Sequence, residues 1–224
     1  MGGAVGSFLT CQRDEELERE FSKFLGKSSS EIPIIFRLND EGKEVKGEKV
    51  TFHGIPPYGP DVIIAVSGSG SVFLIYGTNN HQEEFKKLVR HYGVNLKGVD
   101  DAKKLVLFYL KIVNPHNIFP EILKSFEDVY DQAEVEFRIE SDGKEWESLF
   151  EKWKLLHSDD INKLNFDILT TETKRDQFSV SFYVLSDIDP DDLEYGPVIL
   201  RCTLELSSKG IFSDDIKTSP LWRK

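Results

Sequence analysis

The most chemically suggestive stretch of this chain is an acidic segment that begins at Asp187. Asp187, Asp189 and Asp191 stand at alternate positions. This spacing matches the first ligands of a calcium-binding loop, because a hard cation requires several converging carboxylate oxygens. The match then fails, since Asp192 stands where the loop requires glycine and Val198 where it requires a bidentate glutamate. The segment therefore predicts an acidic turn between two strands, with calcium binding as the alternative and no other cofactor.

Histidine is the next residue type that could act in catalysis or metal binding. None of the five histidines has the i, i+2 or i, i+4 neighbour of a zinc pair, and no cysteine lies beside them. His53 has the most suggestive neighbourhood, because Tyr58 and Asp61 follow it across a proline-rich loop. General acid–base catalysis would require a partner for His53 that the sequence does not show. His53 and Tyr58 are therefore kept only as candidate ligand-binding residues.

The Ser-Gly-rich stretch 67–71 has the composition of a phosphate-binding loop. Such a loop must be followed by Lys-Ser or Lys-Thr and by a helix whose N-terminus meets the phosphate. A strand pattern follows here instead, so we expect a hairpin loop. The chain also contains no G-x-S-x-G elbow and no H-E-x-x-H helix. The sequence therefore favours a protein that is not an enzyme.

Two tryptophans, Trp146 and Trp153, lie seven residues apart on one face of a predicted helix. In a pocket wall they would stack on a flat or apolar ligand, whereas in the simpler interpretation they belong to the core. Tyr130, Tyr183 and His157 are the polar-tipped side chains that we expect near the same face. An apolar ligand between the C-terminal sheet and its helices would contact this set.

The overall charge excludes several classes of partner. The net charge is −11 and the isoelectric point is near 5.0, so the surface repels phosphate backbones and anionic membranes. Basic residues cluster only in pairs, and no stretch reaches the roughly 18 apolar residues of a membrane span. We therefore expect neither a nucleic-acid nor a membrane partner. The two cysteines, Cys11 and Cys202, and the absence of a basic signal-peptide region predict a cytoplasmic protein.

The clearest structural pattern is an alternation of apolar and polar residues between 165 and 209. A period of two predicts three strands, over 165–169, 178–184 and 198–206, with one apolar face. The middle strand carries an inward row that consists of Phe178, Val180, Phe182 and Val184. This pattern is typical of an antiparallel meander, and one of the preceding helices is expected to cover the row. Pro220 argues against regular structure in the tail.

The rest of the chain alternates between strand and helix patterns. These patterns predict helices over 13–25, 81–92, 100–113, 119–132 and 144–157, and strands over 32–38, 49–55, 61–66, 71–77 and 134–140. A strand is the alternative for the apolar run inside 100–113. The helix over 144–157 is expected to open with a capping box at 142–145. Residues before 13 have the composition of a frayed terminus.

Strands thus come in two clusters, with helices between and around them. This order favours an α+β fold, with antiparallel sheets packed against about five amphipathic helices. The chain divides into a β-rich half over 1–95 and a helix-plus-sheet half over 96–224, or forms one domain over 1–224. The function predicted is that of a non-enzymatic interaction or regulatory protein, alone or as a homodimer. The alternative is a small-molecule-binding protein or enzyme with an apolar ligand between the C-terminal sheet and its helices.

Overall fold

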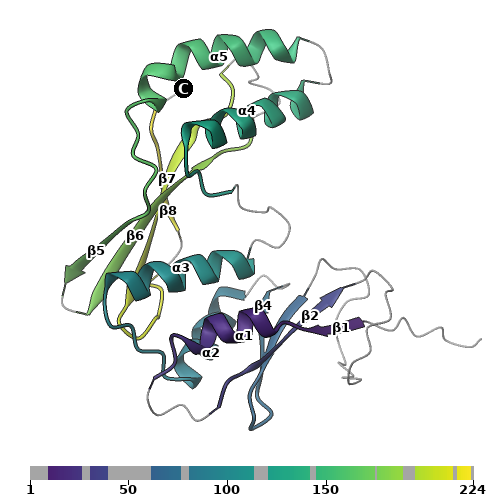
Figure 1. Ribbon diagram of the computed structural model, residues 1–224, viewed down its shortest axis with the longest axis vertical. Coiled ribbons are helices and arrows are strands. Elements are labelled where there is room, and N and C mark those ends of the chain that lie inside the picture. Colours follow the sequence, from purple (N-terminus) through teal and green to yellow (C-terminus); the bar gives the residue numbers. More distant parts are fainter. Residues whose placement is uncertain are drawn as a thin grey trace, which may run out of the picture. The chain divides into compact units, whose positions relative to one another are not determined.

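The computed structural model describes residues 10–26, 31–39, 62–76, 81–113, 121–141, 145–174, 176–188, 195–213 and 216–222. Within these ranges the chain has five helices and two antiparallel four-stranded sheets, so the predicted α+β class is confirmed (Figure 1). Contacts divide the chain into an N-terminal unit, residues 1–118 with 206–212, and a C-terminal unit, residues 119–205 with 213–224. Among the described helices, none has the length and apolar character to cross a membrane.

The sheet of the N-terminal unit has the strand order β1-β2-β3-β4. Its strands are β1 (Thr10–Arg13), β2 (Ile34–Asn39), β3 (Val62–Val66) and β4 (Val72–Tyr76). The last three confirm predicted strands, and β3 and β4 are joined by the expected Ser-Gly hairpin loop. The expected frayed start is wrong for β1, which pairs antiparallel with β2. The predicted strand over 49–55 and the proline-rich loop after it lie outside the described residues.

Three helices complete the N-terminal unit, and all three were predicted. They are α1 (Glu15–Ser22), α2 (His81–His91) and α3 (Val99–Val113), and the strand alternative for α3 is therefore wrong. Helix α1 begins at Asp14, whose carboxylate accepts a hydrogen bond from the backbone N–H of Leu17 at 2.9 Å. The same carboxylate accepts a hydrogen bond from the Arg37 guanidinium at 2.6 Å, which ties the start of α1 to β2.

The sheet of the C-terminal unit has the strand order β5-β6-β7-β8. Its strands are β5 (Leu169–Lys174), β6 (Gln177–Leu185), β7 (Ile199–Ser207) and β8 (Lys217–Pro220). Strands β6 and β7 confirm the second and third strands of the predicted meander, and the four residues of the Phe178 row are buried. The tail prediction is wrong, because β8 pairs with β7. Pro220 is tolerated there because it is the last residue of an edge strand.

The first strand of the meander lies further along the chain than predicted. Residues 165–168 lie before the strand, and there the Asn165 side-chain oxygen accepts a hydrogen bond from the backbone N–H of Asp167 at 3.0 Å, as in an Asx turn. Strand β5 begins only at Leu169 and is mostly exposed and polar. An edge strand with so little burial has no inward row, so apolar alternation did not reveal it.

The helix predicted over 119–132 is confirmed only over 126–132, and the strand predicted over 134–140 is wrong. One helix, α4 (Phe126–Glu140), spans most of the two segments. Its N-cap is Ser125, whose hydroxyl accepts a hydrogen bond from the backbone N–H of Asp128. Val135, Phe137 and Ile139 alternate in the sequence, but only Phe137 is buried, while Val135 and Ile139 are 50% and 64% exposed. The apolar alternation that resembles a strand therefore comes from residues on different faces of one helix.

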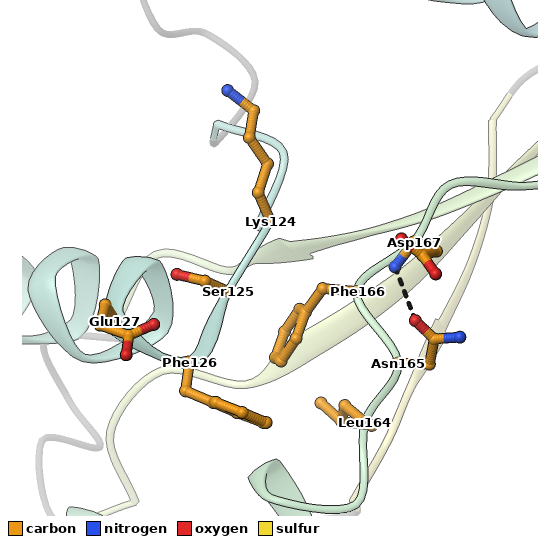
Figure 2. A pocket seen from close by; sticks show the side chains of 8 residues that line it. All are labelled: Lys124, Ser125, Phe126, Glu127, Leu164, Asn165, Phe166 and Asp167. Atoms are coloured by element: carbon orange, nitrogen blue, oxygen red, sulfur yellow. Dashed lines mark hydrogen bonds between the residues drawn. The ribbon is translucent and has the colours of Figure 1, made fainter.

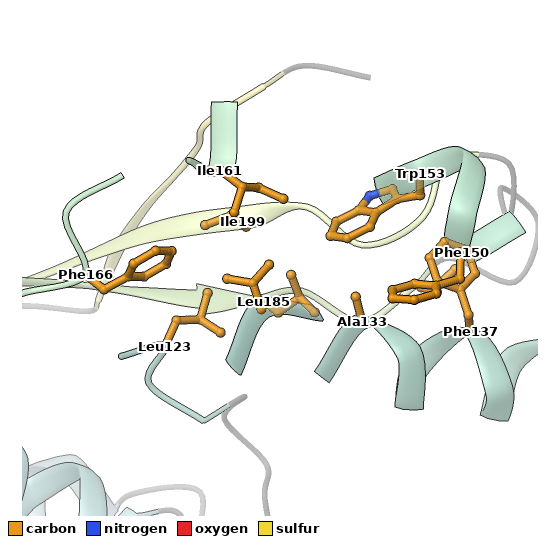
Figure 3. Packing of buried hydrophobic residues seen from close by; sticks show 11 residues of the cluster. Leu123, Ala133, Phe137, Phe150, Trp153, Ile161, Phe166, Leu185 and Ile199 are labelled. Carbon is orange, nitrogen blue, oxygen red and sulfur yellow. The ribbon is translucent and has the colours of Figure 1, made fainter. Parts of the chain in front are cut away.

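Helix α5 (Trp146–Ile161) confirms the last predicted helix, and Figure 1 shows it beside α4. Glu145, the residue before the helix, makes no side-chain cap bond and has a φ of 64°, while residues 142–144 of the expected capping box lie outside the described residues. A shared apolar cluster fills the space between the two helices and the adjoining ends of β6 and β7 (Figure 3). Its strand residues include Leu185 and Ile199 and none of the Phe178 row. The expectation that one of the preceding helices covers that row stays a prediction.

Candidate functional site

An open groove of about 480 Å³ lies where α4 begins, in the C-terminal unit. One wall is the segment Lys124–Glu127 at the start of α4. The other wall is the segment Leu164–Asp167, which connects α5 to β5. Figure 2 shows the eight lining side chains, with Phe126 and Phe166 between the two walls. We refer to this site as the α4 groove.

The floor of the α4 groove is aromatic and aliphatic. The rings of Phe126 and Phe166 meet edge to face, with 5.4 Å between their centroids and an interplanar angle of 86°. Phe166 is buried, whereas Phe126 is 37% exposed. Behind Phe166 lies Tyr183 of β6, with 6.1 Å between the ring centroids. Tyr183, a candidate from the sequence, therefore supports the floor of the groove without being one of its lining residues.

The backbone at the start of α4 is capped by the chain's own side chains. The Ser125 hydroxyl accepts a hydrogen bond from the backbone N–H of Asp128 at 3.2 Å. In return, the Asp128 carboxylate accepts a hydrogen bond from the backbone N–H of Lys124 at 2.7 Å. This reciprocal arrangement is a capping box. It places a carboxylate at the positive end of the helix dipole, the position that an external anion would otherwise occupy.

Three charged side chains line the groove, namely Lys124, Glu127 and Asp167. All three are exposed, and within the described part of the chain none of them forms an ion pair. In Figure 2 the Lys124 side chain extends away from the two phenylalanine rings, while Glu127 and Asp167 stand on the two opposite walls. The groove thus combines an apolar floor with two carboxylates on its rim.

The other aromatic candidates do not line this groove. Trp153 belongs to the core: it is 1% exposed, and its indole N–H donates to the carbonyl oxygen of Pro197 at 3.0 Å. Trp146 lies under the Arg138 guanidinium, 4.9 Å from the ring centroid. The Lys154 ammonium lies over the Tyr130 ring at 5.2 Å. A ligand-binding role for these three residues stays a prediction.

His157 is packed between two tryptophans. Its ring is stacked on that of Trp222 at 4.2 Å, with an interplanar angle of 12°, and lies 5.5 Å from that of Trp153. Burial lowers the pKa of His157, although the nearby Asp160 carboxylate acts in the opposite direction. Burial therefore favours the neutral form of this histidine, whose ring contributes to packing.

Of the acidic candidates, only Asp187 lies within the described residues. It is exposed, just after the end of β6, and it helps to raise the pKa of Glu136 on α4. Burial is the larger cause of that rise, while a hydrogen bond from the Ile188 backbone lowers the same pKa. No group of three or more metal-ligating side chains occurs in the parts of the chain that the structure describes. Asp189 and Asp191, like His53 and Tyr58, fall outside them, so calcium binding stays a prediction.

The residues of the α4 groove were not among the candidates from the sequence. Two local signals mark its walls, namely the Ser125-x-x-Asp128 capping pattern and the Asn165-x-Asp167 turn pattern. Each signal locates a turn, but neither indicates that the two turns face each other, because α4 and α5 separate them along the chain. The groove is therefore a product of the tertiary fold.

Comparison with protein-family models, with curated proteins and with solved structures gives no match for this chain.

Proposed function

We propose that this chain is a non-enzymatic interaction protein that binds a segment of a partner protein in the α4 groove. The observation that carries the proposal is the exposed Phe126 ring, seated in a groove with an apolar floor and a polar rim. Small protein interfaces have this composition, in which an aromatic residue is buried at the centre and polar groups surround it. Phe126 would be that central residue.

Other exposed apolar residues of the C-terminal unit support an interaction role. Val135 and Ile139 lie one turn apart on the outer face of α4, and Leu155 and Leu156 of α5 are 82% and 68% exposed. Single apolar residues are common on protein surfaces, but pairs on neighbouring helices offer additional contact area. The partner could be a second copy of the chain that binds through such residues. The molecular mass of the purified chain in sedimentation experiments would test for this homodimer.

A small apolar ligand is the second candidate for the same groove. Its volume of about 480 Å³ falls within the range of small-molecule sites, which is roughly 300–1,000 Å³. The groove is open, however, whereas sites for small ligands bury most of the ligand surface. A partner segment fits an open groove better, because the rest of the partner can cover the exposed side.

The state of the buried cysteine supports the proposed cytoplasmic setting. Cys202 is a free thiol on the inner face of β7, and burial raises its pKa to about 11. A thiol with this pKa stays protonated at neutral pH and is a poor nucleophile. Cys202 therefore acts as a small apolar core residue, as is usual for cysteine in a reducing compartment.

Selection of peptides from a random display library on the whole chain tests the proposal. Enriched peptides should bind the wild-type chain, and Phe126→Ala should weaken their binding by about 30-fold, the value expected for a central aromatic residue that contributes about 2 kcal/mol. Leu155→Ala is the matched control, because it also shortens an exposed apolar side chain of the same unit but lies outside the groove.

Circular dichroism of the two variants should first confirm that both are folded. Peptides that bind Phe126→Ala as tightly as the wild-type chain would place the binding surface elsewhere. If Leu155→Ala weakens binding as strongly as Phe126→Ala, the groove is not the docking site either.

A further inference from the structure

We infer that the partner segment bound in the α4 groove is basic, with a lysine or arginine next to the aromatic or aliphatic side chain that packs on Phe126. This inference rests on the proposed function of the groove and specifies the chemistry of its occupant. It follows from the charges that the structure places around the apolar floor.

The capping of α4 disfavours an anionic occupant. The N-terminus of a helix attracts anions, because its first N–H groups and the helix dipole both present positive charge. Here the Asp128 carboxylate already lies at that position, where it accepts the hydrogen bond from the Lys124 backbone. An acidic group of a partner would therefore meet a negative charge at the start of α4.

The rim favours a cation for a separate reason. Glu127 and Asp167 stand on opposite walls of the groove and have no cationic partner in the described part of the chain. Lys124 extends away from the floor at the same rim, so the rim as a whole carries two negative charges and one positive charge. A cation on the rim would be attracted by these exposed carboxylates, and one that also lay against an aromatic face would gain a further favourable contact.

The charge of the whole chain acts in the same direction. A net charge of −11 attracts basic segments and repels acidic ones over distances of about 10 Å at moderate ionic strength. This field increases the rate at which a basic partner meets the surface, and the groove then provides the specific contacts.

Three small phenyl compounds of different charge test the inference directly: 2-phenylethylammonium, neutral 2-phenylethanol and 3-phenylpropanoate. Binding to the whole chain is followed by the backbone amide shifts of Phe126, Phe166 and Asp167 in nitrogen-15 correlation spectra. At low salt the cation should bind about three- to tenfold more tightly than the anion, which is the effect expected of two exposed ion pairs. Added salt should reduce this preference.

Two double variants separate the rim from the general field of the protein. Glu127→Gln with Asp167→Asn should remove most of the preference for the cation and leave binding of the neutral alcohol unchanged. Glu151→Gln with Asp159→Asn is the matched control, because it changes the net charge by the same amount at α5 positions outside the groove. This control should keep most of the preference.

Each remaining outcome contradicts the basic partner alone or the proposed docking site as well. Equal binding of the three compounds at the groove overturns the basic partner and leaves the proposed docking site standing, and so does tighter binding of the anion. An equal loss of preference in both double variants also overturns the basic partner, because the field alone would then explain it. If none of the compounds shifts the groove amides, both the inference and the proposed docking site are wrong.

Discussion

Gly196 lies at the most constrained position of the C-terminal core, and replacing it with alanine should destabilise the protein strongly. Its φ is +63°, in the left-handed region that costs a residue with a Cβ about 1–2 kcal/mol. A Cβ built at this position would lie 2.5 Å from Cδ1 of Trp153 and 2.6 Å from Cζ of Phe137. Both rings are fully buried, so neither can move without disturbing the cluster in Figure 3.

The expected cost of Gly196→Ala is the sum of these two effects. Overpacking of a well-filled core adds about 1–3 kcal/mol to the backbone strain, which gives a total of about 2–5 kcal/mol. Gly70 provides the matched control, since its φ is +84° and no atom lies within 4 Å of the Cβ position. Gly70→Ala should therefore show the backbone strain alone. The difference between the two variants measures the packing effect.

Urea unfolding, followed by circular dichroism and by tryptophan fluorescence, provides the measurement. All three tryptophans lie in the C-terminal unit, so their emission reports on the part of the chain that contains Gly196. If Gly196→Ala costs no more than Gly70→Ala, the close approach of Gly196 to the two rings is refuted.

A compensating substitution keeps the test valid if Gly196→Ala is too unstable to measure. Phe137→Leu removes Cζ of Phe137, which would lie 2.6 Å from the new methyl group, so Gly196→Ala should cost about 1 kcal/mol less in this background than in the wild type. Purely additive effects of the two substitutions would show that Phe137 is not the obstacle.

Three further predictions follow from single contacts. Ser125→Ala should cost about 1 kcal/mol in urea unfolding, because it removes the cap of α4, whereas Ser158→Ala, inside α5, should not destabilise the chain. Trp153→Phe should cost about 2–3 kcal/mol in the same assay, since it leaves the Pro197 carbonyl oxygen buried without its donor; an effect below 1 kcal/mol would contradict this role. The pKa of His157 is lowered in the folded state, so the unfolded state binds the proton more readily. The stability due to this group is therefore present above pH 6.5, the usual pKa of histidine, and is lost as the pH falls. Unfolding midpoints at pH 7.5 and 5.5 should show a smaller decrease for His157→Gln than for the wild-type chain.

Elements with one broad apolar stripe could be predicted from the sequence, because their local pattern and their burial agree. Helices α1, α2, α3 and α5 and strands β6 and β7 are of this kind. The errors occurred where burial did not follow the pattern. Phe137 is buried and its neighbours at 135 and 139 are exposed, so a helix had the alternation of a strand. Strand β8 has no apolar pattern, because it is an exposed edge whose position depends on pairing with β7.

The α4 groove could not be predicted from the sequence for a different reason. Phe126 and Phe166 both fell within predicted regular elements, one inside a helix and the other in a strand. Their contact depends on where α4 starts and on the turn at Asn165, and both are decided by side-chain hydrogen bonds to the backbone. Such local capping overrides apolar periodicity over a few residues, which is enough to move a side chain from a core to a groove.

The same hydrogen bonds bear on the proposed docking role of Phe126. The backbone N–H of Leu123 donates to the carbonyl oxygen of Tyr183 at 2.9 Å, so the chain is fixed to β6 just before the capping box begins. The turn at Asn165 fixes the opposite wall in the same way. An anchor held in a rigid groove loses little conformational entropy when a partner binds, so more of its apolar contact energy contributes to affinity.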